Sequence, residues 1–262
     1  MGMNVIASPG RSNPVGQTTR LLRGVHIERS ECARNDISAS VLLSGKGHPA
    51  WNMAVDEALL RIAQQEAQRG LILRFYDWDR PSVSIGYFQK FTLADSHATV
   101  VRRPTGGGFV DHRTDITYSL IFPQDLFGTG PAYAFVHDLV RGVLAQWPAW
   151  QETFLVPSEK ATRGKIARCF QQPSAGDVML QDRKLAGAAQ RRCKGWILHQ
   201  GSIDVGPADV ACRMDVARGL IDRLERHLGT HALARELTAR EATAARQLLE
   251  SRYASDDWNK KF

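Results

Sequence analysis

Residues 165–190 read KIARCFQQPSAGDVMLQDRKLAGAAQ and place Cys169 ahead of Lys184 in a turn-rich region. The thiolate is the nucleophilic form of cysteine, and a nearby ammonium stabilises both a thiolate and the oxyanion of a thioester under attack. Most of the residues that follow Lys184 are small, as in a strand that leaves a narrow channel beside it. Unpaired cysteines are more often buried and inert. Two interpretations therefore stand: a core thiol with an exposed hairpin lysine, or a nucleophile with its polarising partner.

A second candidate site lies in residues 102–112, RRPTGGGFVDH. Three consecutive glycines cost backbone entropy and pack no side chain, so they make physical sense where the main chain approaches a ligand closely. The segment has neither the Walker pattern nor the dinucleotide-binding fingerprint. The alternative is a flexible hairpin turn. The flanking Arg103, Thr105 and His112 favour a binding site.

Other arrangements of reactive residues are weak. Neither GxSxG nor HExxH occurs, and the four cysteines form no CxxC pair. His227 and His231 stand four residues apart at a helix end that we expect to be solvated, so no metal site is expected. Asp56 and Glu57 are interpreted as charges that complement the N-terminal end of their helix.

The elements that position these residues follow from hydrophobic periodicity. Helices are predicted at residues 53–68, 132–147, 210–224 and 237–253. Strands are predicted at residues 71–78, 82–88, 98–103, 115–122 and 196–205, with a strand–turn–strand unit at 177–190.

The ends of two helices carry specific signals. Asn52 is predicted to cap the first helix and Gly70 to end it. Thr238 and Glu241 form the Thr-x-x-Glu pattern of a capping box. In the strand at 115–122, apolar residues alternate with Thr117 and Ser119, which predicts one buried face.

These elements predict an α+β fold with a mixed or mostly antiparallel sheet flanked by helices. The chain has 262 residues, 43% of them apolar, enough for one substantial domain. Residues 1–37 are rich in Gly, Ser, Asn, Pro and Arg, and we expect a flexible arm there. Residues 38–262 are expected to form a single domain with a helical C-terminus.

Charge and cysteine content limit the setting. No apolar run reaches the roughly 20 residues that span a bilayer, and few cysteines indicate a reducing compartment, so we expect a cytoplasmic protein without membrane contact. The net charge of +7 fits either nucleic acid or acidic protein partners. The arginines are spread along the chain without a recognition module, which disfavours nucleic acid. We expect a monomer.

The motifs occur in a fixed order: NMAVDEALL, LRFYDWDRPSVSIGYFQ, RRPTGGGFVDH with DITYSL, CFQQPSAGDVML, and RKLAGAAQRR with HQGSI. Together they resemble the lipoate–protein ligase/octanoyltransferase family, itself similar to biotin ligases, and most closely its LipM-type octanoyltransferases. The resemblance covers about residues 38–258 and implies the biotin/lipoate protein ligase-like catalytic fold. One such motif is a weak signal, whereas five in order are a strong one.

The resemblance implies roles by position. Cys169 matches the nucleophile of the octanoyltransferase branch, and Lys184 matches a lysine that contacts the acyl carbonyl. The residues matching the family's binding loop and acyl tunnel are Arg103, Thr105, Gly106, Gly107, Gly108, His112, Gly187 and Ala189. Two positions depart from the pattern. Gly176 stands where a tyrosine is common, which bears on access to the tunnel, and HQGSI replaces a QHGSI-like order, which leaves the role of His199 open.

The activity implied is octanoyl transfer from octanoyl-acyl carrier protein to a lysine of an apo lipoyl domain or glycine-cleavage H protein, through a Cys169 thioester. Because thioester exchange is nearly isoenergetic, no cofactor is expected. An ATP-dependent lipoate–protein ligase, which would use ATP and Mg and has no need of Cys169, is one alternative. An amidotransferase that moves octanoyl between lipoyl proteins is another, and a basic nucleic-acid-binding protein is an alternative outside enzymes.

Overall fold

The structure is a computed structural model that describes residues 37–66, 69–91, 97–128, 130–160, 173–206 and 210–262. These residues belong to one structural unit, which extends from Asp36 to Phe262. The arm predicted at residues 1–37 lies, except for its last residue, outside the described part of the chain. Within the described residues, no helix is long and apolar enough to cross a membrane.

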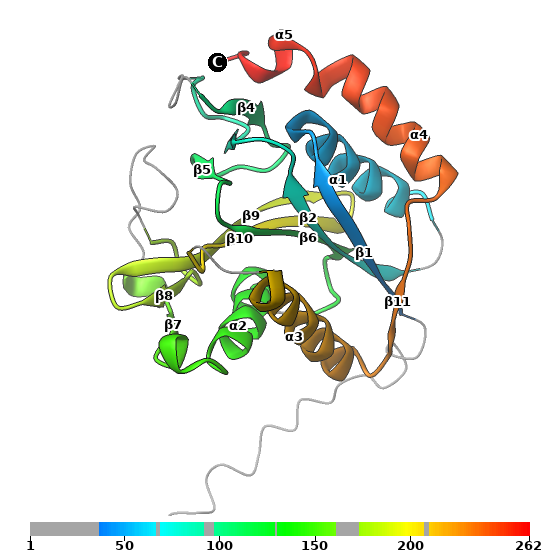
Figure 1. Cartoon of the computed structure of the whole chain (residues 1–262). Helices are drawn as coiled ribbons and strands as arrows, with labels where there is room; N and C mark the ends of the chain where they lie inside the picture. Colours follow the sequence, from blue (N-terminus) through cyan, green and yellow to red (C-terminus); the bar gives the residue numbers. More distant parts are fainter. Residues whose placement is uncertain (1–36, 67–68, 92–96, 129, 161–172, 207–209) are drawn as a thin grey trace, which may run out of the picture. The chain divides into compact units, whose positions relative to one another are not determined.

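The larger sheet has the strand order β11–β1–β2–β6–β10–β9–β8–β7 (Figure 1). β1 pairs in parallel with β2 and β11, and the remaining neighbours pair antiparallel. The strands are β1 (Ser38–Gly47), β2 (Gly70–Trp78), β6 (Ile116–Pro123), β7 (Phe154–Leu155), β8 (Val178–Leu180), β9 (Arg183–Cys193), β10 (Trp196–Ile203) and β11 (Ala232–Ala234). The predicted α+β class with a mixed sheet is confirmed.

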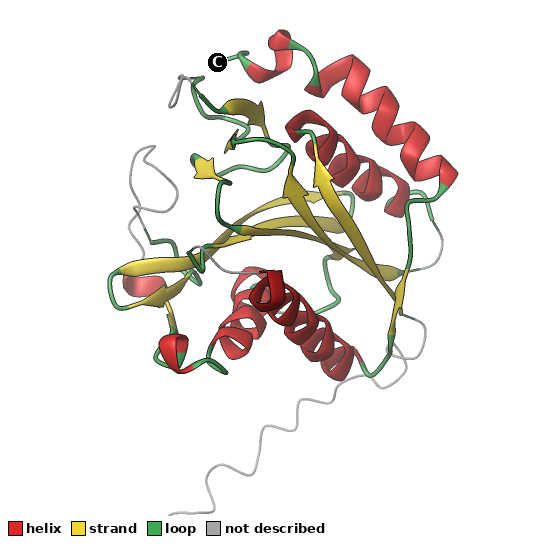
Figure 2. Ribbon diagram, in the orientation of Figure 1, coloured by secondary structure: helices red, strands yellow, loops and turns green. Residues whose placement is uncertain are grey.

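Helices cover both faces of this sheet (Figure 2). One apolar cluster joins α2 and α3 to one face, and a second joins α1 and α4 to the other. The helices are α1 (Pro49–Ala63), α2 (Ala132–Leu144), α3 (Val210–Leu228), α4 (Ala239–Leu248) and α5 (Asp256–Asn259), with short turns η2 (Pro148–Trp150), η3 (Ser158–Lys160) and η4 (Leu249–Tyr253). The capping box of α4, with Thr238 and Glu241, is present as predicted.

The start of α1 differs from its prediction. The helix begins at Pro49, with His48 as its N-cap. Proline is common at the first helical position, because the N–H that it lacks would have no partner within the helix there. Asn52 is therefore an interior residue, and its side-chain amide donates to the backbone oxygens of Gly47 and Asp77. The helix ends at Ala63 rather than at Gly70.

The strand β6 is buried on both faces rather than one. One face is apolar and packs with α2 and α3 through Ile116, Tyr118, Leu120 and Phe122. The opposite face carries Thr117, Ser119 and Ile121, and Ile121 packs in the apolar cluster of α1 and α4. The hydroxyls of Thr117 and Ser119 donate to the carboxylates of Asp115 and Asp56, which compensates the cost of burying them. The alternation of apolar and hydroxyl residues in this strand thus reflects a buried polar face rather than a solvated one.

A smaller sheet stands beside the α1 face and has the order β4–β3–β5. Its strands are β3 (Ser82–Ile85), β4 (Thr99–Arg102) and β5 (Val110–Asp111). The strand predicted at 82–88 ends at Ile85 because Gly86 lies against the carbonyl of Gly107, where a Cβ atom would come within 1.9 Å of the oxygen. The glycine segment follows β4 and is held against β3 in this way.

Candidate active site

A cavity opens between the α1 face of the larger sheet and the smaller sheet. Its lining brings together Arg103, His112, Lys184, Gly187 and Ala189, which the sequence placed in two separate segments. The other lining residues are Met53, Tyr76, Trp78, Ser84, Val110, Thr117, Ala188, Gln200, Gly201 and Ser202. Most of the wall is apolar, with cationic and hydroxyl groups at a few points. Such a cavity suits an alkyl chain with one polar end.

Arg103 holds the glycine loop from inside. Its guanidinium donates to the backbone oxygens of Gly106 at 2.7 Å and Gly108 at 2.8 Å. The same group donates to the backbone oxygen of Ser84 at 3.0 Å and to its hydroxyl at 2.9 Å. Gly107 has a φ of +84°, which favours glycine. The loop predicted to bind ligand is therefore preorganised by a buried cation that also reaches the cavity wall.

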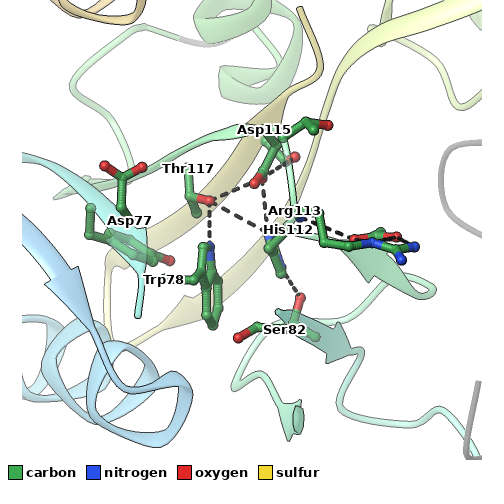
Figure 3. Close-up of polar contacts among 12 residues, drawn as sticks. Asp77, Trp78, Ser82, His112, Arg113, Asp115 and Thr117 are labelled. Carbon is green, nitrogen blue, oxygen red and sulfur yellow. Dashed lines mark hydrogen bonds and ion pairs between the residues drawn. The ribbon is translucent and has the colours of Figure 1, made fainter. Parts of the chain in front are cut away.

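His112 stands at the centre of a buried polar cluster (Figure 3). Its Nδ1 lies 2.8 Å from Asp115 Oδ2, and its Nε2 lies 2.7 Å from the Ser84 hydroxyl. Because the Ser84 oxygen accepts from Arg103, its hydrogen is available to His112 Nε2, which places the imidazole hydrogen on Nδ1. The ring also stacks on Trp78 at a centroid distance of 4.1 Å.

Asp115 is the anion of this cluster. Burial alone would raise the pKa of its carboxyl, but His112 and the hydroxyls of Ser202 and Thr117 outweigh burial and hold that pKa below its usual value. Thr117 in turn accepts from the indole N–H of Trp78 at 2.8 Å. The cluster joins residues of both sheets and in this way fixes one side of the cavity wall.

A second buried network lies beneath the cavity and involves residues that the sequence analysis missed. The Thr105 hydroxyl donates to Gln200 Oε1 at 2.7 Å, and Gln200 Nε2 donates to Asp56 Oδ2 at 2.7 Å. Asp56 also accepts from Arg74 and from Ser119. Thr105 is not among the residues that line the cavity, and its hydroxyl anchors the glycine loop to β10 instead.

The interpretation of Asp56 and Glu57 as helix-end charges is wrong. Both lie within α1 and are buried. Asp56 pairs with Arg74 at 2.7 Å, and Glu57 pairs with Arg61 and Arg252. Burial raises the pKa of Glu57, but Tyr253 and the two arginines lower it more, and the net pKa is below its usual value. These carboxylates tie α1 to β2 and η4, because a buried charge requires a partner.

The HQGSI order now has a structural explanation. Neighbouring residues on a strand point to opposite faces. Gln200 lines the cavity, whereas His199 faces α2 and lies 3.3 Å from the Tyr118 hydroxyl. Burial, together with His137, holds the pKa of His199 well below its usual value. His199 is thus a neutral core residue on the side away from the cavity.

Lys184 is buried, with only 4% of its surface exposed, so the alternative of an exposed hairpin lysine is wrong. Its ammonium lies 2.7 Å from Asp177 Oδ2. A Cβ atom at Gly187 would come within 2.2 Å of Lys184 Cε, so the lysine chain crosses directly over this glycine. Here the small residues predicted to line a tunnel, Gly187 and Ala189, lie beside an ammonium on one wall.

Two predictions from the sequence have different outcomes. Cys169 lies outside the described residues, so its closeness to Lys184 stays a prediction. Gly176 does not belong to the cavity lining given above. It has a φ of +84° and lies against Tyr133 and Ala134 of α2, where a larger side chain would be strained and crowded.

The family model for the lipoyl protein ligase A/B catalytic domain matches residues 48–219. The octanoyltransferase LipM of Kyrpidia tusciae is 32% identical over 270 residues, covering 84% of this chain and 97% of its own length. The octanoyltransferase LipM of Bacillus subtilis is 31% identical over 271 residues, covering 83% and 96%.

Solved structures show the same fold. Lipoate-protein ligase A bound with ATP aligns with a TM-score of 0.65 at 22% identity, covering 85% of this chain and 98% of that one. A bipartite lipoate protein ligase of Thermoplasma acidophilum, described with its E2 lipoyl domain, aligns with a TM-score of 0.62 at 22% identity, covering 86% and 96%. At this identity, the likeness supports the fold alone.

Proposed function

Since the chain belongs to the lipoyl protein ligase A/B catalytic domain family and is an acyltransferase, we propose that it transfers an octanoyl group to a lysine of a lipoyl-domain protein. The observation that carries this proposal is the buried Lys184 ammonium on the wall of a largely apolar cavity. The apolar character of the wall matches an alkyl chain, and an ammonium stabilises the oxyanion that forms when the carbonyl of such a chain is attacked.

The reaction has two steps. The Cys169 thiolate attacks the thioester carbonyl of octanoyl-acyl carrier protein, a new C–S bond forms, and the C–S bond to the carrier breaks. The carrier leaves as a thiolate and takes up the proton that Cys169 released. The amine of the acceptor lysine, on a lipoyl domain or on glycine-cleavage H protein, then attacks the enzyme thioester. A C–N bond forms, the C–S bond to Cys169 breaks, and the proton that the amine loses passes to the departing sulfur. The free energy of the thioester drives the second step, so neither ATP nor a metal is used.

Sequence similarity supports the transferase over the ligase alternative. The LipM octanoyltransferases are 32% and 31% identical to this chain. The ligases align at 22% identity, and their ATP-dependent chemistry is not transferred on that basis.

The protein should form a covalent octanoyl adduct when it is mixed with octanoyl-acyl carrier protein in the absence of ATP. Intact mass and hydroxylamine treatment detect the thioester, and Cys169→Ala should abolish it. Cys193→Ala is the matched control, because Cys193 is a half-buried cysteine at the far end of β9 and should leave the adduct unchanged.

Three outcomes would contradict the proposal. An adduct that survives Cys169→Ala assigns the nucleophile elsewhere, and product that needs ATP and free octanoate supports a ligase. Octanoylated H protein serving as donor, with no reaction of the carrier thioester, supports the amidotransferase.

Lys184→Ala should slow transfer by roughly 10²- to 10³-fold, the usual effect of losing one donor to an oxyanion.

A further inference from the structure

Lys184 forms a closely held ion pair with Asp177. The two charged groups are 2.7 Å apart, and their side chains are 3% and 0% exposed. Removing two charges from water to this degree is expensive, and replacing such pairs by apolar residues is often neutral or stabilising. Stability alone is therefore a weak reason for the pair, and the position of the lysine on the cavity wall suggests another.

Asp177 is itself fixed by several groups. Its Oδ1 accepts from the Tyr133 hydroxyl of α2 at 2.6 Å, and its Oδ2 accepts from the backbone N–H of Ser174 at 2.6 Å. The Tyr133 hydroxyl also accepts from the backbone N–H of Ala188 at 3.0 Å. The carboxylate is thus fixed to α2, to its own turn and to β9.

The turn that carries Asp177 is shaped by Gly176. Its backbone oxygen accepts from His137 Nδ1 at 2.6 Å, and its positive φ turns the chain into β8. The register of β8 with β9 then shifts between Val178 and Met179, and Met179 pairs with Lys184. This geometry brings the carboxylate to the lysine across the hairpin.

Among the described residues, the titratable groups packed near the pair from α2, β6 and β10 are uncharged. From α2, His137 has a pKa lowered to about 4, mainly by burial. From β6, burial raises the pKa of Tyr118, and from β10, burial lowers the pKa of His199. Tyr133 donates its hydrogen to Asp177 and is uncharged in doing so. The Asp177 carboxylate is the anion that pairs with Lys184, and Arg103 is a further cation on the same cavity wall.

We propose that Asp177, held by Tyr133, is a positioning residue that keeps the Lys184 ammonium over Gly187 on the cavity wall. This inference rests on the proposed role of Lys184 in acyl transfer. The carboxylate acts through the lysine, because its oxygens are engaged by Tyr133, Ser174 and Lys184 and it is absent from the cavity lining.

The test compares the steady-state kcat and KM of Asp177→Asn with those of the wild-type protein and of Asp177→Glu. An amide of the same shape keeps the packing but removes the charge that holds the ammonium. We expect kcat to fall by roughly 10-fold or more, with KM little changed. Asp177→Glu, which keeps a carboxylate, should recover most of the lost kcat.

A matched control removes a carboxylate whose partner is next to Lys184 in the sequence. Asp204→Asn removes the carboxylate that pairs with the exposed Arg183 of β9, and it should change neither kcat nor KM. If Asp177→Asn does not fold, Tyr133→Phe provides the test, because it deletes one hydroxyl that holds the carboxylate and should lower kcat without changing KM.

The failures are distinguishable. If the wild-type protein forms no adduct on Cys169, the proposed function fails. If it forms the adduct and Asp177→Asn keeps the wild-type kcat, or Asp177→Glu loses as much kcat as Asp177→Asn, the inference about Asp177 is overturned. An unchanged kcat in Tyr133→Phe would likewise overturn it where that variant carries the test.

Discussion

At the scale of single residues, the site depends on a glycine that a side chain crosses. Gly187 lies beneath Lys184, and a Cβ atom there would also come within 2.6 Å of the ammonium nitrogen. The sequence indicated a tunnel lined by small residues. The structure adds that one of them makes room for the lysine rather than only for the ligand.

Gly187→Ala should therefore reduce both transfer and stability. The nearest atoms to the new methyl group are Cε and Nζ of Lys184, so the end of this side chain must shift although its ammonium is paired with Asp177. We expect a transfer rate lower by roughly 10- to 100-fold, because misplacement by about 1 Å has effects of this size. The free energy of unfolding should fall by about 1–3 kcal/mol, because the buried ion pair is disturbed.

Gly130→Ala provides the control, since a Cβ atom at Gly130 meets nothing within 4 Å. A Gly187→Ala variant with full activity would show that the position of the ammonium over this glycine is unimportant.

At the scale of elements, the smaller sheet holds the glycine loop against the cavity. Gly86 ends β3 and touches the backbone of Gly107, while Arg103 connects the loop to Ser84. Thr105 and Gln200 attach the same loop to β10 of the larger sheet. The loop is thus held from both sheets by backbone and side-chain contacts.

Gly86→Ala should disturb this arrangement in a way that a flexible side chain cannot relieve. The added Cβ atom would lie 1.9 Å from the Gly107 carbonyl oxygen, so the backbone of the loop must move. We expect a loss of about 1–3 kcal/mol in the free energy of unfolding, together with reduced transfer. Chemical denaturation and the adduct assay measure the two effects.

Gly106→Ala is the control for stability, because a Cβ atom there meets no atom within 4 Å. Equal losses of stability in the two variants would contradict the close packing of β3 against the loop.

At the scale of the whole molecule, buried ionisable groups lower the free energy of unfolding as pH falls. His137 and His199 have pKa values below their usual range in the folded protein, so protonation favours the unfolded chain as pH falls below about 6.5. Glu57 and Asp115 also have lowered pKa values, so their contribution is lost at more acidic pH, as pH falls through their folded-state pKa values.

We expect the free energy of unfolding to fall between pH 7 and pH 5. A pKa of about 4 for His137, against about 6.5 in the unfolded chain, accounts for on the order of 2 kcal/mol at pH 5. His137→Asn removes that titration and should make the pH dependence shallower. Denaturant titrations at both pH values measure the free energy of unfolding. An equal fall in this free energy between pH 7 and pH 5 for the two proteins would show that His137 does not contribute.

The sequence by itself determined the fold class, the helices and most strands, and the two segments that form the site. These signals are local: apolar periodicity, the capping box at Thr238 and the glycines near Arg103 act within a few residues of the chain. Periodicity did not give the strand β1, nor the short strands β5, β7 and β11, which are defined by pairing with other strands.

Only the tertiary structure decided which charged and polar groups meet. Asp56 reaches Gln200 because α1 packs on β10, and Asp177 reaches Lys184 because β8 and β9 shift register beside α2. Such pairings depend on strand order and on which face each side chain takes, and a shift of one residue reverses that face. For this reason a lysine that composition left as an exposed hairpin residue is a buried ammonium on the cavity wall.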